Sequence, residues 1–117
     1  MATYGKEVLS GSTHGRGIKV VATSIGSGTT IHTAQASTTT EDLITLFAHN
    51  DDTEPRTLTL GWGGTSDPDD LIILEIAPQA GLTLVVADLP LRNSLAVLAA
   101  ADSANKIVIF GSVNRIS

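Results

Sequence analysis

Short apolar runs separated by clusters of turn residues are the feature that most limits what this chain can fold into. In "RTLTLGW" Leu58, Leu60 and Trp62 alternate with smaller residues, whereas "LIILEI", "LTLVV" and "KIVIF" are apolar almost throughout. Successive side chains of a strand point to opposite faces, so these runs predict half-buried and buried strands. The clusters between them, including "NDDTEP", "GGTSDPDD" and "ADSAN", favour turns. One strand in about every 10 to 12 residues predicts an all-β fold, an antiparallel β-sandwich or jelly-roll-like barrel.

Two of the predicted strands have a helical alternative. Thr38 and Glu41 have the spacing of a capping box ahead of "DLITLFAHN", and "NSLAVLAAADSA" is rich in alanine with a possible cap at Asn93 or Ser94. Each helix would have only two or three turns and would still need to bury its apolar face against a sheet. We favour strands in both places because the neighbouring segments are predicted strands, and the helical alternative stays open.

The first part of the chain differs from the rest. Residues 1–17 contain four glycines and few apolar residues, and ordering a glycine-rich segment costs much chain entropy. We therefore predict a flexible, Gly-rich N-terminal arm over 1–17, ordered by a partner or mobile, and a single sandwich domain over 18–117. At 117 residues, 42% of them hydrophobic, the chain is long enough for one core without disulfides.

Charge is unevenly distributed along the chain, whose net charge is -5. Residues 1–20 contain three bases and one acid, whereas residues 41–70 contain eight acids and one base. Binding to nucleic acid needs clustered bases with aromatic side chains for stacking, and aromatic residues make up only 3% of the chain, so we predict no direct contact with nucleic acid. There is no cysteine, no apolar run of membrane-spanning length and no apolar stretch typical of a signal peptide at the start, so we expect synthesis in the cytoplasm and no membrane contact.

No residue pattern indicates catalysis or a cofactor. His14, His32 and His49 do not have the spacing of metal ligands and are expected to be structural or surface residues. "GSGTT" is neither a nucleophile motif nor a phosphate loop. The acidic segments "NDDTE" and "SDPDD" lack the pattern of a calcium loop. We predict that the protein is not an enzyme and has no cofactor or metal; a binding module that uses these acidic loops and Trp62 for carbohydrate or Ca²⁺ stays an alternative.

The composition favours a protein that acts through its surface. Threonine-rich sheets with few charges suit close contacts, because little side-chain entropy and little charge desolvation oppose binding. The candidate partner-binding residues are the bases of the arm and its border, one aromatic residue beside glycines, and one base near the end: Lys6, Arg16, Lys19, Trp62 and Arg115. In the last strand Ile107 and Ile109 should face one side and Val108 and Phe110 the other, with Arg115 either in an ion pair between subunits or solvated.

Four segments together resemble a known class of proteins: "TTIHTA", "EDLITLFAHN", "LTLGWGGTSDPDDLIILEIAPQAGLTLVV" and "ANKIVIFGSVNRI". Over roughly residues 18–116 the chain is similar to small virion structural proteins of tailed bacteriophages, a class that includes the capsid decoration, or cement, proteins. The resemblance implies a protein on the capsid exterior that binds the major capsid protein, with the bases of the arm facing an acidic capsid surface, and that stabilises the viral capsid. Another virion part, such as a tail, head-fibre or fibre-base protein, is the alternative. We also expect a homo-oligomer, a trimer or a dimer with the trimer favoured, because an apolar sandwich should not leave its strand edges bare.

Overall fold

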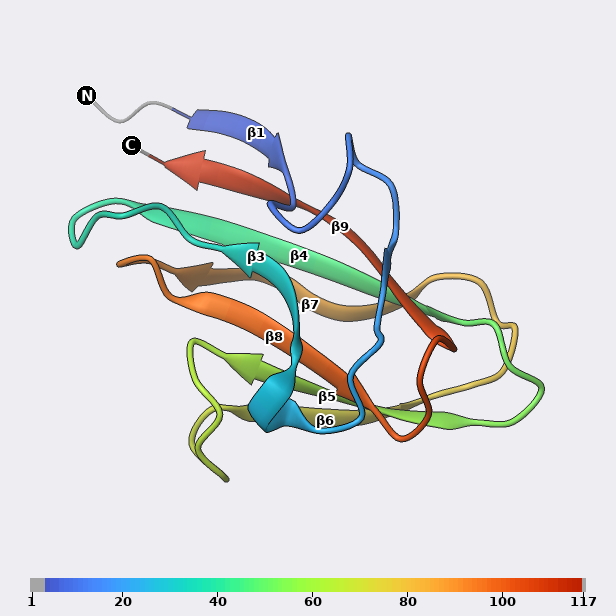
Figure 1. Ribbon diagram of the computed structural model, residues 1–117. Helices are drawn as coiled ribbons and strands as arrows, with labels where there is room; N and C mark the ends of the chain where they lie inside the picture. The colour runs from blue at the N-terminus through green and yellow to red at the C-terminus, as the bar shows by residue number, and fades with distance from the viewer. Residues whose placement is uncertain (1–3, 117) are drawn as a thin grey trace.

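The computed structural model describes residues 4–116 as two antiparallel sheets packed face to face (Figure 1). In the first sheet the order is β1 (Tyr4–Val8), β9 (Ile107–Ile116), β4 (Glu41–Asn50) and β7 (Thr83–Leu91), and β2 (Ile18–Lys19) also pairs with β9. In the second sheet it is β3 (Thr29–Thr33), β8 (Ala96–Ala101), β5 (Arg56–Trp62) and β6 (Leu71–Ile76), with a short 3-10 helix, η1 (Ile25–Ser27), before β3. The predicted antiparallel β-sandwich is confirmed, and its jelly-roll-like variant stays a prediction. Among the described residues no helix is long and apolar enough to cross a membrane.

Both segments with a helical alternative are strands. In β4 every second residue from Asp42 to Asn50 is buried and the residues between them are half-buried, which is the period of a strand with one face in the core. β8 follows a turn in which Asn93 and Ser94 both have positive φ, 64° and 60°, and the Leu95 amide donates to the Arg92 carbonyl. Asn93 and Ser94 therefore form the turn that carries the chain from β7 in one sheet to β8 in the other, and they cap no helix.

The core lies between the inward faces of the two sheets. In the last strand Ile107, Ile109 and Val113 are buried, whereas Val108 and Phe110 point to the other face, as the alternation predicts. β9 pairs with β4 along its whole length, from Glu41 opposite Ile116 to Asn50 opposite Ile107. With β1 and β2 along its other edge, β9 is a central strand of its sheet.

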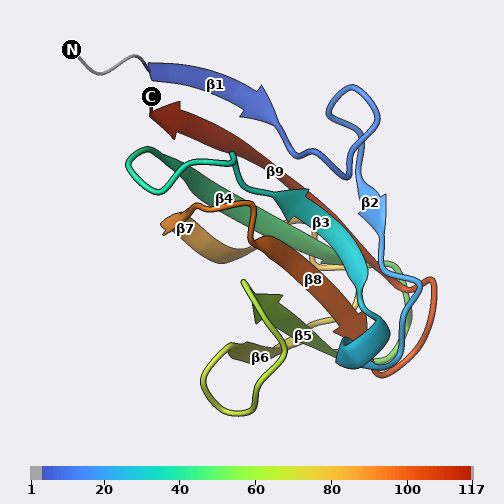
Figure 2. The same ribbon diagram turned by 60° about the vertical axis from the view of Figure 1, so that its left-hand side comes forward.

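The predicted arm contacts both sheets. Residues 4–8 pair with β9 as strand β1, Leu9 is buried in the core, and the Gly11 amide donates to the Ile31 carbonyl of β3 at 3.0 Å. Figure 2 shows this segment running along β9 before it continues into β2. Residues 1–3 of the predicted arm lie outside the described residues, and the flexibility of the segment stays a prediction.

Candidate functional site

Strand β1 is the most exposed strand of the fold. All five of its residues are exposed, and Tyr4 and Val8 have 73% and 51% of their surface accessible. It lies at the end of its sheet and pairs only with β9 among the described strands. In Figure 1 it extends beyond the body of the sandwich. Both of its faces and one backbone edge are therefore open.

The register of β1 assigns its side chains to two faces. Residues directly opposite each other on paired strands point to the same face. Glu7 lies opposite Val113, which is buried, so Glu7 is on the inward side. Tyr4, Lys6 and Val8 are consequently on the outward side, a lysine between two apolar side chains.

The inward side of β1 adjoins a buried ion pair. The Arg115 guanidinium donates two hydrogen bonds to Asp42, from Nε to Oδ1 at 2.8 Å and from Nη2 to Oδ2 at 3.0 Å. Its Nη1 lies 3.6 Å from Oε1 of Glu7. Because a buried carboxylate is costly without partners, this bidentate pair is what allows a charge on the inward face of β4.

His32 completes the network from the second sheet. Its Nε2 lies 2.8 Å from Oδ2 of Asp42, and its Nδ1 accepts a hydrogen bond from the backbone amide of Ser10 at 3.0 Å. An imidazole nitrogen that accepts carries no proton, so these partners assign the neutral tautomer, with the proton on Nε2. The network therefore fixes the chain directly after β1 to β3.

The residues Ser10, His32 and Asp42 are those of a hydrolase triad, but their geometry is different. The Ser10 hydroxyl oxygen accepts the Thr33 amide at 2.7 Å, and it is the backbone amide of Ser10 that contacts the imidazole. A nucleophile needs its own oxygen within hydrogen-bond distance of the base. His32 is also 1% exposed, so no substrate reaches it. The arrangement is an anchor for the N-terminal segment.

The pKa of Asp42 reflects the same contacts. Burial by itself raises the pKa of this carboxyl group, but the hydrogen bonds from Arg115 and His32 and the charge of the guanidinium outweigh it and hold the pKa below its usual value. The hydrogen bond to Asp42 likewise raises the pKa of Arg115. The pair is therefore ionised at neutral pH.

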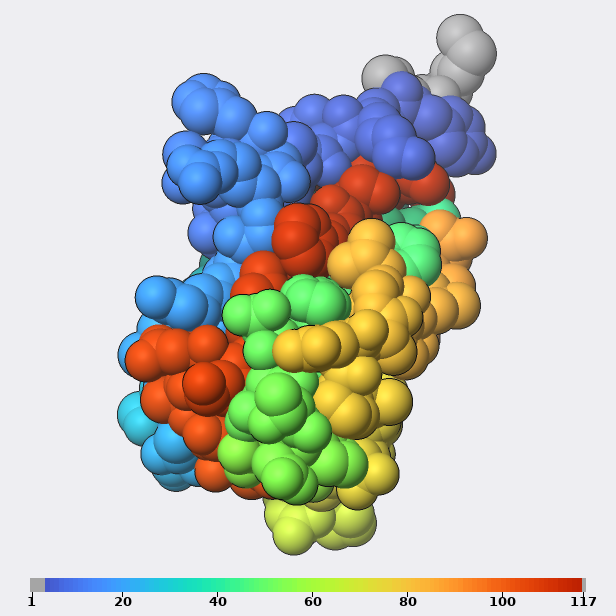
Figure 3. Space-filling model, turned by 90° about the vertical axis from the view of Figure 1, so that its right-hand side faces the viewer, coloured from blue at the N-terminus to red at the C-terminus, as the bar shows by residue number. Residues whose placement is uncertain are grey.

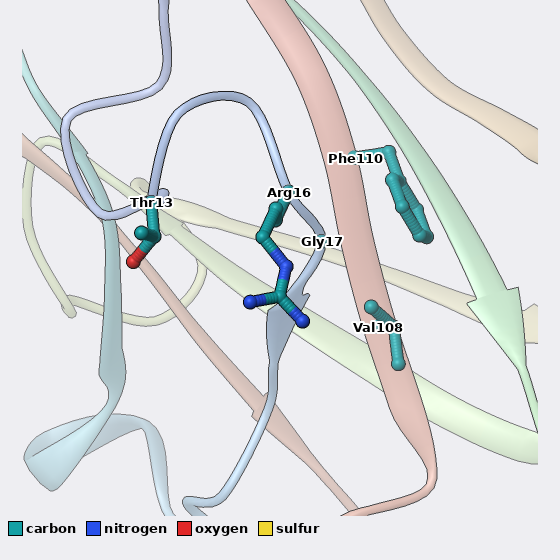
Figure 4. Close-up of a pocket in the computed structure, with 5 residues that line it drawn as sticks. All are labelled: Thr13, Arg16, Gly17, Val108 and Phe110. Atoms are coloured by element: carbon teal, nitrogen blue, oxygen red, sulfur yellow. The ribbon is translucent and has the colours of Figure 1, made fainter.

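A second surface lies on the outward face of the same sheet. Phe47 and Phe110, the only phenylalanines of the chain, are directly opposite each other on β4 and β9, and both are half-buried on the side away from the core. Beside Phe110 is a hollow lined by Thr13, Arg16, Gly17, Val108 and Phe110 (Figure 4). Large aromatic side chains on a solvent-facing sheet, with a guanidinium next to them, are typical of binding surfaces.

The predicted partner-binding residues do not form one cluster. Arg16 and Lys19 come together near Val108, since Lys19 lies opposite that residue in the pairing of β2 with β9. Lys6 lies opposite Asn114, about 20 Å further along β9 at the usual rise of a strand. Trp62 is in the other sheet, packed against the core, with Nε1 3.4 Å from the carbonyl oxygen of Pro90. Arg115 pairs within the chain, and a role for it toward a partner stays a prediction.

Sequence reasoning missed the roles of Asp42 and His32. One signal was present in the sequence. Asp42 lies on the same face of its strand as Ile44, Leu46 and Ala48, so if that face lies in the core, the Asp42 carboxylate is buried too. The partner of that carboxylate could not be predicted, because Arg115 is 73 residues away in sequence.

The acidic segments do not assemble into a metal site in the part of the chain that the structure describes. Among residues 4–116 no three side chains of His, Asp or Glu are placed to hold one ion. Asp52 instead bonds Arg56, whose Nη2 is 2.6 Å from its Oδ2, and Asp70 accepts the Ser66 amide at 3.1 Å. Two of these acids therefore stabilise their own loops.

No family model matches the chain, and neither a curated protein nor a solved structure matches it.

Proposed function

We propose that this chain is a non-enzymatic structural protein of a tailed-phage virion, which binds the outer surface of the capsid through β1 and stabilises the shell. The observation that supports this proposal most is the exposure of β1 on both faces and along one edge. Fixing the backbone of a residue costs about 1 to 2 kcal/mol, and exposed side chains recover little of it. A strand of this kind gains most from a partner that covers it.

The outward face of β1 suits a partner that is partly apolar and partly acidic. Tyr4 and Val8 offer apolar area, and Lys6 between them offers a positive charge. The open backbone edge can pair with a strand of the partner, which is a common mode of recognition. The major capsid protein is the partner that we propose.

The anchor beneath β1 supports the same function. Glu7, Arg115 and Asp42 hold the inward side, and His32 holds the chain at Ser10. A binding strand whose base is already fixed loses less entropy when the partner binds. A ligand that binds only the assembled shell stabilises it by mass action, and many copies multiply the effect.

The test uses heads of the phage that encodes the chain, produced without its gene. Purified protein is added back, the heads are sedimented, and their melting and their cryo-electron microscopy density are compared with those of heads without the protein. We expect the protein to sediment with the heads, to raise their melting temperature and to give density in many copies on the exterior. Failure to sediment with the heads would contradict capsid binding. Density at the tail of complete particles would instead favour a tail or fibre component.

A further inference from the structure

We infer that copies of this chain associate head to tail, with the segment Asp67–Pro68–Asp69 of one copy seated in the hollow beside Arg16 of the next. This contact uses no side chain of β1, although the turn that carries Arg16 lies next to Val8, and it does not depend on capsid binding.

The floor of the hollow is apolar and firmly built. The Gly17 backbone lies so close to β9 that a Cβ atom there would be 2.5 Å from Cγ1 of Val108 and 2.7 Å from Cζ of Phe110. Phe47 lies beside Phe110, and Leu84, 54% exposed, lies opposite Phe47 on β7. The result is an apolar strip across three strands, next to a hollow of about 490 Å³.

Arg16 is held at the rim of this hollow by a closed turn. His14 and Gly15 have φ of 54° and 91°, and the Arg16 amide donates to the Thr13 carbonyl at 3.0 Å, as in a type I′ turn. The Ser12 hydroxyl donates to the Arg16 carbonyl at 2.7 Å and closes the loop a second time. Figure 4 shows the Arg16 side chain extending alongside β9. With Lys19 beside Val108, two cations therefore border the apolar floor, and the turn fixes the backbone that carries Arg16.

The complementary surface is the loop between β5 and β6. Residues 63–70 contain three aspartates and no base. Asp70 is used inside the loop, where its carbonyl accepts the Trp62 amide and its carboxylate accepts the Ser66 amide. Asp67, Pro68 and Asp69 are all exposed. The loop thus presents an apolar ring between two carboxylates.

These two surfaces match in charge and in kind. The proline ring fits an aromatic floor, and its two flanking carboxylates fit the two cations at the border of that floor. Figures 2 and 3 show that the N-terminal segment and the β5–β6 loop lie at opposite ends of the molecule. One copy can therefore offer its loop to one neighbour and its hollow to another, which gives a closed ring or an open chain of copies. A ring of three copies would be the trimer that the sequence analysis expects.

The test uses the charge-reversed variant Arg16→Glu and the neutral double variant Asp67→Asn/Asp69→Asn, in sedimentation velocity without capsids. We expect the unchanged protein to form oligomers and each variant alone to remain monomeric. In an equimolar mixture the intact loop of the Arg16→Glu copy meets the intact hollow of the other variant. The other two surfaces of that dimer, a charge-reversed hollow and a neutral loop, have no opposite charges to attract each other, so the mixture should stop at dimers.

Glu75→Arg is the matched control, because it reverses an exposed carboxylate on β6 of the second sheet, opposite Thr57 and near the end of the strand that is remote from the loop. It should assemble like the unchanged protein. All substituted side chains are exposed, so circular dichroism should show the same fold for each variant, and Arg16→Gln or the single variant Asp69→Asn replaces a variant that does not fold. An unchanged protein that stays monomeric as its concentration rises overturns the inference. Variants that still assemble alone also overturn it. A mixture that forms no dimer, or that grows beyond dimers, does the same.

Discussion

The carboxylate of Asp42 and the guanidinium of Arg115 form a bidentate pair, with hydrogen bonds of 2.8 and 3.0 Å, on the inward face of the sheet that carries β1. Glu7 extends the pair to β1 and His32 extends it to β3. The two sheets are thus joined by polar contacts at the end of the sandwich where the exposed strand lies. Because β1 is the proposed binding strand, the pair connects the stability of the fold to the function of the protein.

Replacing Asp42 with Asn should destabilise the fold strongly. The substitution leaves the Arg115 charge without its carboxylate, and breaking a buried pair in this way costs about 3 kcal/mol, at the lower end of the usual range because Arg115 is 33% exposed. The free energy of unfolding, measured in urea, gives the loss. Asp51→Asn, at a carboxylate 76% exposed, is the control and should change it little. Equal effects of the two substitutions would show that the pair is not an anchor.

The depressed pKa of Asp42 predicts how stability depends on pH. Because the pKa is lower in the folded state, the contribution of this group is complete above its unfolded-state pKa of about 4 and is lost as the pH falls through its folded-state pKa. The free energy of unfolding of the unchanged protein should therefore fall below about pH 4. The Asp42→Asn variant should show a shallower fall, since it binds one proton fewer on unfolding there. Urea titrations from neutral to acidic pH measure both curves, and parallel curves would be inconsistent with this assignment.

His32→Leu should release the chain after β1 while the sandwich stays folded. The substitution removes the acceptor of the Ser10 amide and one donor to Asp42, and an unsatisfied buried group costs about 1 to 3 kcal/mol. Relative to the unchanged protein, the variant should accelerate hydrogen exchange more at the Ser10 amide than at the amides of β5. His49→Leu is the control, because His49 is half-buried and contacts the Gly81 carbonyl, at 3.2 Å from Nδ1, and the exposed Asp51, at 3.7 Å from Nε2, but not the N-terminal segment. Unchanged protection of Ser10 in His32→Leu would contradict the anchoring role.

Two glycines of the same sheet should respond differently to alanine. At Gly111 a Cβ atom would overlap the carbonyl oxygen of Thr45, so the pairing of β4 with β9 must shift, and overpacking of this kind costs about 1 to 3 kcal/mol. At Gly5 a Cβ atom has no neighbour within 4 Å. Gly5→Ala should therefore leave the urea midpoint nearly unchanged while Gly111→Ala lowers it. A similar fall in both variants would contradict the steric explanation, because the smaller entropy of the unfolded chain by itself makes alanine the more stable residue.

The sequence predicts the strands well because their signal is local. The alternation from Asp42 to Asn50 is the same pattern in the sequence and in the burial of β4. The choice of the inward face is less local: both faces of "DLITLFAHN" are largely apolar, and only the pairing with β9 and the position of the second sheet place Phe47 outside the core. That choice creates the aromatic surface.

The candidate sites could be predicted only in part, for a similar reason. Lys6, Arg16 and Lys19 can be chosen from their charge, but their separation along β9 depends on backbone pairing that has no sequence pattern. The glycine-rich sequence likewise predicts an arm but not its attachment, because backbone hydrogen bonds join the arm to β9 and β3. Such bonds leave no pattern of residue types in the sequence. Asp42 and Arg115 meet only because distant strands are neighbours in the sheet.

The most direct test of β1 as the binding strand measures binding to phage heads that lack the protein. The unchanged chain is compared with the double variant Tyr4→Ser/Val8→Ser, which removes the apolar side chains of the outward face of β1, and with Ile73→Ser, which removes a side chain 60% exposed on the other sheet. If β1 is the binding strand, the double variant should bind at least about tenfold more weakly, a loss of about 1.4 kcal/mol, and Ile73→Ser should bind like the unchanged protein. Equal binding of the double variant and the unchanged chain would contradict the account.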